Sequence, residues 1–323
     1  MAVYSVIIPI YNEEEVLDAS YRRIKAVMET ADASYELIFV NDGSRDQSKD
    51  ILAKLSATDD TVRVIHFSRN FGHQNAISAG MDYATGDAII CIDADLQDPP
   101  EVMLEMIEQW KLGFHVVYGK RKRREGDNVF KKTTAHLYYR LLRSLTTVDI
   151  PVDVADFRLI DRAVCDVLKH NIRERNRYIR GLVAWVGFSQ TFVEYTRDKR
   201  FAGETKYPLK KMIKFATDGI TAFSYAPLKL ATRIGFFISL ASFIHLCFVM
   251  FQTLVLKTTV DGWASTMSVI LFSQGIVLIM LGIIGEYIGR IFQEIKNRPM
   301  YVVAETLGYP KHTTNIQKKE GEN

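Results

Sequence analysis

The sequence has few cysteines and almost no net charge, and each shortage excludes a class of protein. The three cysteines, Cys91, Cys165 and Cys247, are scattered over 323 residues, which is too sparse for a disulfide framework or a cysteine metal cluster. This usage predicts a reducing compartment for the part of the chain that carries them. A formal net charge of +3 gives no electrostatic reason to expect a nucleic acid partner.

Glycine-rich phosphate-binding motifs are missing as well. Neither GxGxxG nor GxxxxGK[ST] follows any apolar run, so the motifs exclude a Rossmann dehydrogenase and a P-loop NTPase. The first ten residues form a short strand-like run that leads into a polar loop, which predicts no signal peptide. With 48% apolar and 24% charged residues, the composition is globular, and the length suggests about two domains.

Long uncharged runs are present, and both lie near the C-terminal end. Residues 234–256 and 262–285 contain no Asp, Glu, Lys or Arg. Because a membrane-spanning helix needs ~20 such residues, the two runs predict a transmembrane hairpin, with a pair of buried core helices as the alternative. Five basic residues flank the hairpin, whereas its short link contains only one, and this bias predicts that both chain ends are cytoplasmic. The flanking residues are Lys229, Arg233, Arg290, Lys296 and Arg298.

These patterns divide the chain into four parts. Residues 1–207 are expected to form a cytosolic α/β domain, 231–292 two transmembrane helices, and 293–323 a cytosolic tail. Residues 208–230 repeat apolar side chains at helical spacing, with lysines on another face. This predicts amphipathic helices on the membrane surface, where lysines meet anionic lipid. An ordinary amphipathic helix packed on the soluble domain is the alternative.

Within the first part, apolar strand-like runs alternate with helical patterns. Such alternation indicates a mainly parallel sheet covered by helices on both faces. Sheets of this kind bind ligands beyond the carboxyl ends of their strands. The expected strands are residues 3–10, 35–42, 62–67, 87–93 and 115–119, and the expected helices are 13–31, 46–56, 73–84 and 100–110.

The carboxyl ends of these strands are unusually polar. Asn41 and Asp42 end the second strand, and Asp93 and Asp95 end the fourth. In an extended segment residues i and i+2 point to the same face, so the carboxylates of Asp93 and Asp95 repel each other unless a cation lies beside them. Mg²⁺ or Mn²⁺ suits this arrangement, because these ions take few oxygen ligands from protein and the rest from phosphate and water.

Several segments together resemble a known family. In chain order, VIIPIYNEEE, VNDGSRDQS, RNFGHQNAISAG, DADLQDPPE and RFAGETKY resemble the family 2 inverting glycosyltransferases of the GT-A fold. The two uncharged runs and the segment GIIGEYIGRIFQEIKNRPMY resemble one branch, the polyprenyl-phosphate glycosyltransferases. That branch includes bactoprenol glucosyltransferases of the GtrB type and the dolichol-phosphate mannose synthases. The resemblance implies a Rossmann-like GT-A cytosolic domain followed by interfacial helices and the transmembrane hairpin.

The resemblance also assigns site residues. The metal and diphosphate site falls on Asp93, Asp95 and Gln97, with Asp95 as the most direct ligand. Asp156 matches the catalytic carboxylate, and Asp153 is the second choice. The implied donor-binding residues are Pro9, Tyr11, Glu13, Asp42, Arg69, Asp93, Ala94, Asp95 and Gln97. Among the basic residues, those expected to bind the acceptor phosphate are Arg121, Lys131, Arg200 and Lys206.

The chemistry of the acceptor suggests what Asp156 does. A phosphate monoester has a second pKa of ~6 and is already largely anionic at pH 7, so little base catalysis is needed. We therefore expect Asp156 to position groups or stabilise charge at the sugar, and not chiefly to accept a proton. Arg158 is expected to bridge Asp156 or the donor diphosphate. His73 begins a helix and is interpreted as a capping or packing residue.

Transfer of a single sugar is favoured over polymer synthesis. The Q-x-x-R-W motif of processive enzymes is absent from the nearest stretch, NRYIRG, and two spans are few for a polymer channel. The resemblance implies transfer of glucose from UDP-glucose to undecaprenyl phosphate at the bacterial inner membrane. Donors of the UDP-GlcNAc, GDP-mannose or UDP-aminoarabinose type are alternatives, as is a non-catalytic homologue. The resemblance further implies a flippase and a downstream periplasmic glycosyltransferase as partners. Glycines in the two uncharged runs permit close helix contacts, which suits either a homo-oligomer or packing within one chain.

Overall fold

A computed structural model describes most of the chain, which forms two compact units. The described residues are 3–122, 154–175, 177–197, 226–255 and 262–309. Of these, the first unit contains the residues up to 197 and those from 299 onward, and the second contains the remainder. The predicted amphipathic segment at 208–225 lies outside the described residues.

Eight strands of the described chain form one sheet in the first unit. Their order is β7-β5-β6-β4-β1-β2-β3-β8. The strands along the chain are β1 (Tyr4–Ile10), β2 (Tyr35–Asn41), β3 (Val62–Phe67), β4 (Ala88–Cys91), β5 (Val116–Arg121), β6 (Val154–Asp161), β7 (Gln190–Tyr195) and β8 (Val303–Leu307). Every residue of β1 and β4 is buried, as expected for apolar strands covered on both faces.

The sheet is mainly parallel, as predicted, although two of its described strands, β6 and β8, run antiparallel to the others. β4, β1, β2 and β3 run parallel, as predicted. Towards one side, β6 lies antiparallel between β4 and β5, and at the other edge β8 is antiparallel to β3. The predicted fifth strand is therefore separated from β4 by a strand from later in the chain. This insertion brings residues beyond 153 next to the loop that follows β4.

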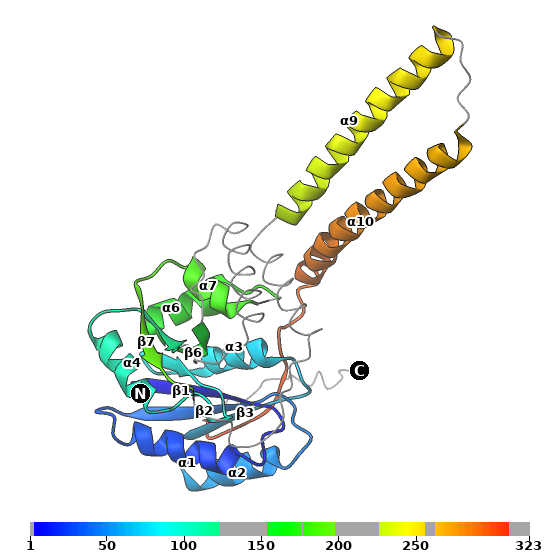
Figure 1. Cartoon of the computed structure of the whole chain (residues 1–323). Coiled ribbons are helices and arrows are strands. Elements are labelled where there is room, and N and C mark those ends of the chain that lie inside the picture. Colours follow the sequence, from blue (N-terminus) through cyan, green and yellow to red (C-terminus); the bar gives the residue numbers. More distant parts are fainter. Residues whose placement is uncertain (1–2, 123–153, 176, 198–225, 256–261, 310–323) are drawn as a thin grey trace, which may run out of the picture. The chain divides into compact units, whose positions relative to one another are not determined.

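Helices cover both faces of the sheet. Figure 1 shows α1 and α2 on one face and α3 on the other. Alternation along β1 explains the two layers, because Val6 and Ile8 share a core with α1, α2 and α4, whereas Ile7 faces α3. There a Cβ on Gly80 would come within 2.3 Å of the Ile7 side chain. The helices are α1 (Leu17–Met28), α2 (Ser48–Thr58), α3 (His73–Tyr83), α4 (Val102–Lys111), α6 (Arg162–Asp166) and α7 (Ile179–Trp185), with a π-helical turn at Val167–Asn171.

The strand β8 closes one edge of the sheet with residues from the far end of the chain. Just before it, the ring of Tyr301 stacks on Phe67 of β3 with centroids 5.0 Å apart. The Tyr301 hydroxyl donates a hydrogen bond to Asp82 at the end of α3. Arg173 pairs with the same carboxylate at 2.7 Å. Of the segment 293–323, expected to be a tail, the described residues 299–309 thus belong to the first unit and contribute a strand to its sheet.

The described part of the second unit consists mainly of two long helices, α9 (Ala226–Leu254) and α10 (Trp263–Ile295). Each contains a stretch long and apolar enough to cross a membrane, at Pro227–His245 and Phe272–Ile295. The helices contact each other where Gly235 lies beside Met280, with the position of a Cβ on the glycine 3.4 Å from the methionine side chain. Both predicted spans are therefore helical where described, and α10 continues past the expected end of its span.

Candidate active site

The polar loops that follow β1 to β4 meet at one edge of the sheet, because these four strands run parallel. β1 lies between β2 and β4, so the strand order reverses there. Ligands of open α/β sheets bind at such a reversal, beyond the carboxyl ends of the strands. Tyr11, Asp42 and Asp93 follow β1, β2 and β4 at this edge, which is where the sequence predicts the site.

Asp93 and Asp156 come together through the pairing of β4 with β6. Cys91 of β4 pairs with Arg158 of β6 in antiparallel register. The same register carried two residues further sets Asp93 opposite Asp156. Two segments far apart in the sequence therefore bring the acidic loop and the predicted catalytic carboxylate into one site.

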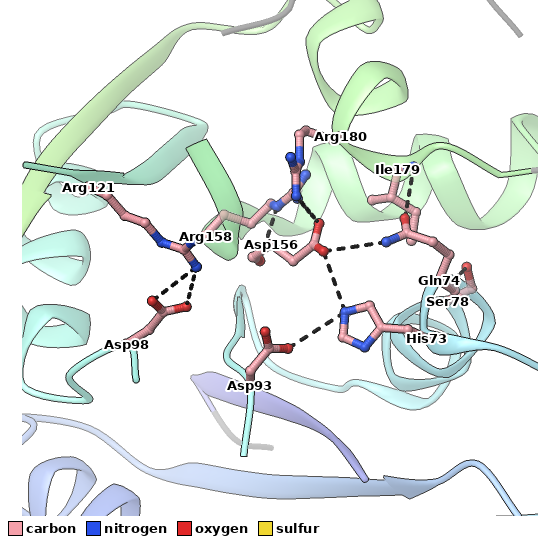
Figure 2. Close-up of polar contacts among 10 residues, drawn as sticks. All are labelled: His73, Gln74, Ser78, Asp93, Asp98, Arg121, Asp156, Arg158, Ile179 and Arg180. Carbon is pink, nitrogen blue, oxygen red and sulfur yellow. Dashed lines mark hydrogen bonds and ion pairs between the residues drawn. The ribbon is translucent and has the colours of Figure 1, made fainter. Parts of the chain in front are cut away.

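His73 contacts both of these carboxylates, as Figure 2 shows. Its Nε2 is 3.4 Å from Asp156 Oδ2 and 3.6 Å from Asp93 Oδ1. Burial disfavours a charge on the ring, but the two carboxylates outweigh it and raise the pKa of His73 to about 9. The side chain at the start of α3 thus belongs to the site. This corrects its interpretation as a capping or packing residue.

Asp156 is surrounded by cations and hydrogen-bond donors. Arg158 Nη2 lies 2.7 Å from Asp156 Oδ1, Arg180 Nη2 lies 3.4 Å from the same oxygen, and Gln74 Nε2 lies 3.5 Å from Oδ2. Burial alone would raise the pKa of Asp156, but Arg180, His73 and Arg158 together hold it well below its usual range. Asp156 is therefore an anion and a weak base. The contact with Arg158 agrees with the predicted bridge to Asp156.

A second buried carboxylate, Asp98, holds Arg121. Asp98 is 1% exposed; Arg121 Nη2 lies 3.3 Å from its oxygens, and the Tyr195 hydroxyl donates to it at 2.6 Å. These contacts join the loop after β4 to β5 and β7, and they orient the Arg121 side chain, which stays about one-third exposed. Sequence reasoning missed Asp98, although it stands in the same acidic run as Asp93 and Asp95.

Asp42, predicted to contact a nucleoside, also anchors the loop after β3. Its carboxylate accepts hydrogen bonds of 2.6–2.9 Å from the side chain of Asn70 and from the next two backbone N–H groups. Gly43 allows the close approach of the two loops, because its φ is +67° and a Cβ there would lie 2.4 Å from the Arg69 carbonyl carbon. The anchored loop leads directly into His73. The nucleoside contact of Asp42 stays a prediction.

The other predicted donor ligands differ in how much surface they offer. Tyr11 is 39% exposed, and the Arg69 guanidinium lies 4.0 Å from the centroid of the Phe71 ring, so both present flat surfaces near the site. Pro9 and Ala94 are buried, which leaves them a scaffolding role or a backbone contact. Glu13 is half-buried in the turn before α1.

The acidic loop after β4 has the chemistry of a divalent-cation site. Burial and the carboxylates of Asp156, Asp98 and Asp95 raise the pKa of Asp93 to about 6, and a cation relieves this crowding of like charge. Asp95 Oδ1 accepts from the Gln97 backbone N at 3.1 Å, which folds the loop. Among the described residues, no three His, Cys, Asp or Glu side chains gather as metal ligands. The crowded carboxylates of Asp93 and Asp95 fit Mg²⁺ or Mn²⁺, which take few ligands from protein and the rest from substrate phosphates and water.

Part of the predicted acceptor site lies outside the described residues. This part includes Lys131, Arg200 and Lys206. Asp153, the second choice for the catalytic carboxylate, also lies outside the described residues. Lys120, the first residue of the basic run, lies on β5 and pairs with Glu194 of β7 at 2.9 Å. The phosphate contacts of Lys131, Arg200 and Lys206 stay predictions.

Two family models match the chain. The model of glycosyl transferase family 2 matches residues 5–168, which include the loops described above. The model of the GtrB C-terminal hairpin matches residues 226–291, which correspond to α9 and most of α10. The first match lies mostly within the first unit, and the second lies within the second unit.

Curated relatives are similar over nearly the whole chain. An uncharacterized glycosyltransferase of Bacillus subtilis (strain 168) is 55% identical over 305 residues, covering 94% of each chain. An uncharacterized glycosyltransferase of Synechocystis is 44% identical, covering 94% of this chain and 95% of that one. A prophage-derived bactoprenol glucosyl transferase of Shigella flexneri is 40% identical, covering 94% of this chain and 97% of that one.

Proposed function

The chain belongs to glycosyltransferase family 2, and from this premise we propose that it transfers one glucose from UDP-glucose to undecaprenyl phosphate, with inversion at the anomeric carbon. The name of the Shigella relative and the match to the GtrB hairpin support this sugar and this acceptor. The observation that carries the proposal is the meeting of Asp93, Asp156 and His73 at the strand reversal of the sheet. The acidic loop after β4, which suits a divalent cation, thus lies beside the anionic carboxylate of Asp156.

In the proposed reaction, a phosphate oxygen of the lipid attacks the anomeric carbon of glucose. The bond from that carbon to the β-phosphate oxygen of UDP breaks, and its electron pair leaves with UDP. The attacking oxygen is already anionic at pH 7, because the second pKa of a phosphate monoester is ~6. The protein therefore has no proton to remove. Its tasks are to orient two anions and to stabilise the charges that develop between them.

The residues around the diphosphate divide these tasks. Asp93, Asp95 and Gln97 would hold Mg²⁺ or Mn²⁺ against the donor diphosphate. When bound, the divalent cation neutralises negative charge on the leaving group. Arg121, oriented by Asp98, grips the acceptor phosphate with its planar fork.

Asp156 acts as a fixed anion beside the sugar. Its low pKa makes it a poor proton acceptor, but a fixed negative charge favours the positive charge that grows at the anomeric carbon as the bond to UDP breaks. Arg158 and Arg180 hold the carboxylate in place. This supports the positioning role that the sequence suggests for Asp156.

The long helices anchor the enzyme at the membrane that holds its acceptor. Two helices able to span a bilayer and the hairpin match support membrane attachment. The finer proposal is a two-pass protein of the bacterial inner membrane, with both termini and the family 2 domain in the cytoplasm. A homo-oligomer, a flippase for the lipid-linked sugar and a downstream periplasmic transferase complete the proposal.

A transfer assay with a panel of donors tests this function. Purified full-length protein is incubated with undecaprenyl phosphate, Mg²⁺ or Mn²⁺, and labelled UDP-glucose, UDP-GlcNAc, GDP-mannose or a UDP-aminoarabinose donor, with and without EDTA. We expect lipid-linked glucose from UDP-glucose and none in EDTA. Product from another donor alone would overturn the choice of sugar. No product from any donor would overturn enzymatic transfer to this lipid and favour a non-catalytic homologue.

A further inference from the structure

Gln74, the second residue of α3, connects Asp156 with the start of α7. Its Nε2 lies 3.5 Å from Asp156 Oδ2, and its Oε1 accepts a hydrogen bond of 3.2 Å from the backbone N of Ile179, as Figure 2 shows. Ile179 is the first residue of α7, and the first N–H groups of a helix have no acceptor within it. One amide group therefore serves both the carboxylate and the helix that carries Arg180.

The two partners fix the orientation of this amide. A backbone N–H can only donate, so the atom that faces Ile179 has to be oxygen, and the nitrogen then faces Asp156. An anionic carboxylate can only accept, so both contacts require the same orientation. Glutamate at this position would accept from Ile179 but repel Asp156. Leucine would do neither.

A second contact, one helical turn further along α3, holds the same segment. The Ser78 hydroxyl donates to the backbone oxygen of Gln74 at 2.8 Å and accepts from Nη1 of the buried Arg177 at 3.0 Å. Positions 74 and 78 lie on one face of the helix. The helix α3 thus holds Arg177 and Ile179 at two points, and Arg180 follows directly.

We infer that Gln74 is a positioning residue that keeps Asp156 and Arg180 in register for sugar transfer. The effect on rate rests on the proposed function, whereas the hold on α7 does not. Without the amide, Asp156 keeps Arg158 from its own strand but loses one of its ties to α3, and α7 loses the acceptor for its first N–H. Arg180 then shifts relative to Asp156. A misplacement of ~1 Å at a reaction centre can lower the rate on the order of a hundredfold.

Two substitutions separate the two ends of the amide. Gln74→Leu removes both contacts, and Gln74→Glu keeps an acceptor for Ile179 while placing a second carboxylate against Asp156. Gln109→Glu, on α4, is the matched control for the same change elsewhere. In the full-length protein, kcat and KM are measured for donor and acceptor, and hydrogen exchange is followed in peptides that cover residues 177–185.

We expect kcat to fall about 10- to 100-fold in both Gln74 variants, with little change in either KM, because Gln74 acts through Asp156 and Arg180. Exchange over residues 177–185 should rise in Gln74→Leu and stay near wild type in Gln74→Glu, and Gln109→Glu should match wild type throughout. A wild-type kcat in Gln74→Glu would overturn the positioning of Asp156. Unchanged exchange in Gln74→Leu would overturn the hold on α7. If the wild-type protein transfers no sugar, the proposed function fails, and the exchange result alone still decides the hold on α7.

Discussion

Replacing Asp156 by asparagine is the sharpest test of how the site works. The change preserves the size of the side chain but removes the negative charge that faces Arg158 at 2.7 Å and Arg180 and His73 at 3.4 Å. If Asp156 stabilises charge at the anomeric carbon, Asp156→Asn lowers kcat at every pH. If Asp156 is a general base, the loss shrinks as the pH rises.

The structure sets two magnitudes for this variant. Removing a group aimed at developing charge costs on the order of 10²–10³ in kcat, and we expect a loss of that size. Asp156 is 15% and Arg158 4% exposed, so the variant also leaves a buried arginine without its anion. Breaking a buried ion pair costs about 3–5 kcal/mol, and we expect the lower value because asparagine still offers an acceptor. For a unit of ~200 residues this lowers Tm by roughly 6–12 °C.

The assay measures initial rates of lipid-linked sugar formation from pH 6 to 9 at saturating substrates, together with Tm, in the full-length protein. Asp166→Asn is the control, because the Asp166 side chain is 46% exposed and pairs with Arg162 at 3.8 Å, a contact that adds little stability. Its rate and Tm should stay close to wild type. A kcat for Asp156→Asn within about threefold of wild type would refute the reasoning. So would a loss that disappears between pH 7 and 9.

Three further predictions address the metal, the acceptor and acid stability. EDTA should stop transfer and added Mg²⁺ or Mn²⁺ should restore it in wild type but not in Asp95→Asn; full restoration in the variant would exclude Asp95 as a ligand. Arg121→Lys should raise KM for undecaprenyl phosphate about tenfold with little change in the donor KM, because the planar fork is lost; an unchanged acceptor KM would contradict this contact. Burial would raise the pKa of Asp59, but hydrogen bonds from Lys25, Thr61 and Tyr21 together lower this pKa. The ionised Asp59 therefore stabilises the fold above its unfolded pKa of ~3.9, and this stability is lost as the pH falls further. Asp59→Asn should therefore lower stability by about 1–3 kcal/mol at pH 7, and Tm measured against pH should show the gap closing below pH ~4; a gap that persists there would refute the assignment.

Much of the fold could be predicted from the sequence because its elements are long or strongly periodic. The strands β1 to β5 and the helices α1 to α4 lie close to their expected residues. The strand β6 was missed because polar side chains such as Asp156 and Arg158 interrupt its apolar pattern. The strand β8 is a short edge strand of five residues that pairs antiparallel with β3. This segment is a strand because it pairs with β3, and its own residues do not show that pairing.

The candidate site could be predicted less completely. Acidic residues at the strand ends indicated that the loops after β2 and β4 belong to the site. The resemblance to the family located Asp156. The position of His73 between Asp93 and Asp156 depends on the register of β4 and β6, which residue spacing does not encode. Nothing in the sequence pointed to Gln74, because its proposed role depends on the contacts of its side-chain amide with Asp156 and Ile179.

The return of the chain to the sheet at β8 makes the membrane hairpin an insertion within the sequence of one folded unit. A fragment that stops before residue 208 would lack β8 and leave Phe67 without Tyr301. The backbone groups of β3 would then be open to pairing with other molecules, which promotes aggregation. A soluble form of the enzyme is therefore better made by internal deletion, with the first part of the chain joined to Pro299, than by truncation.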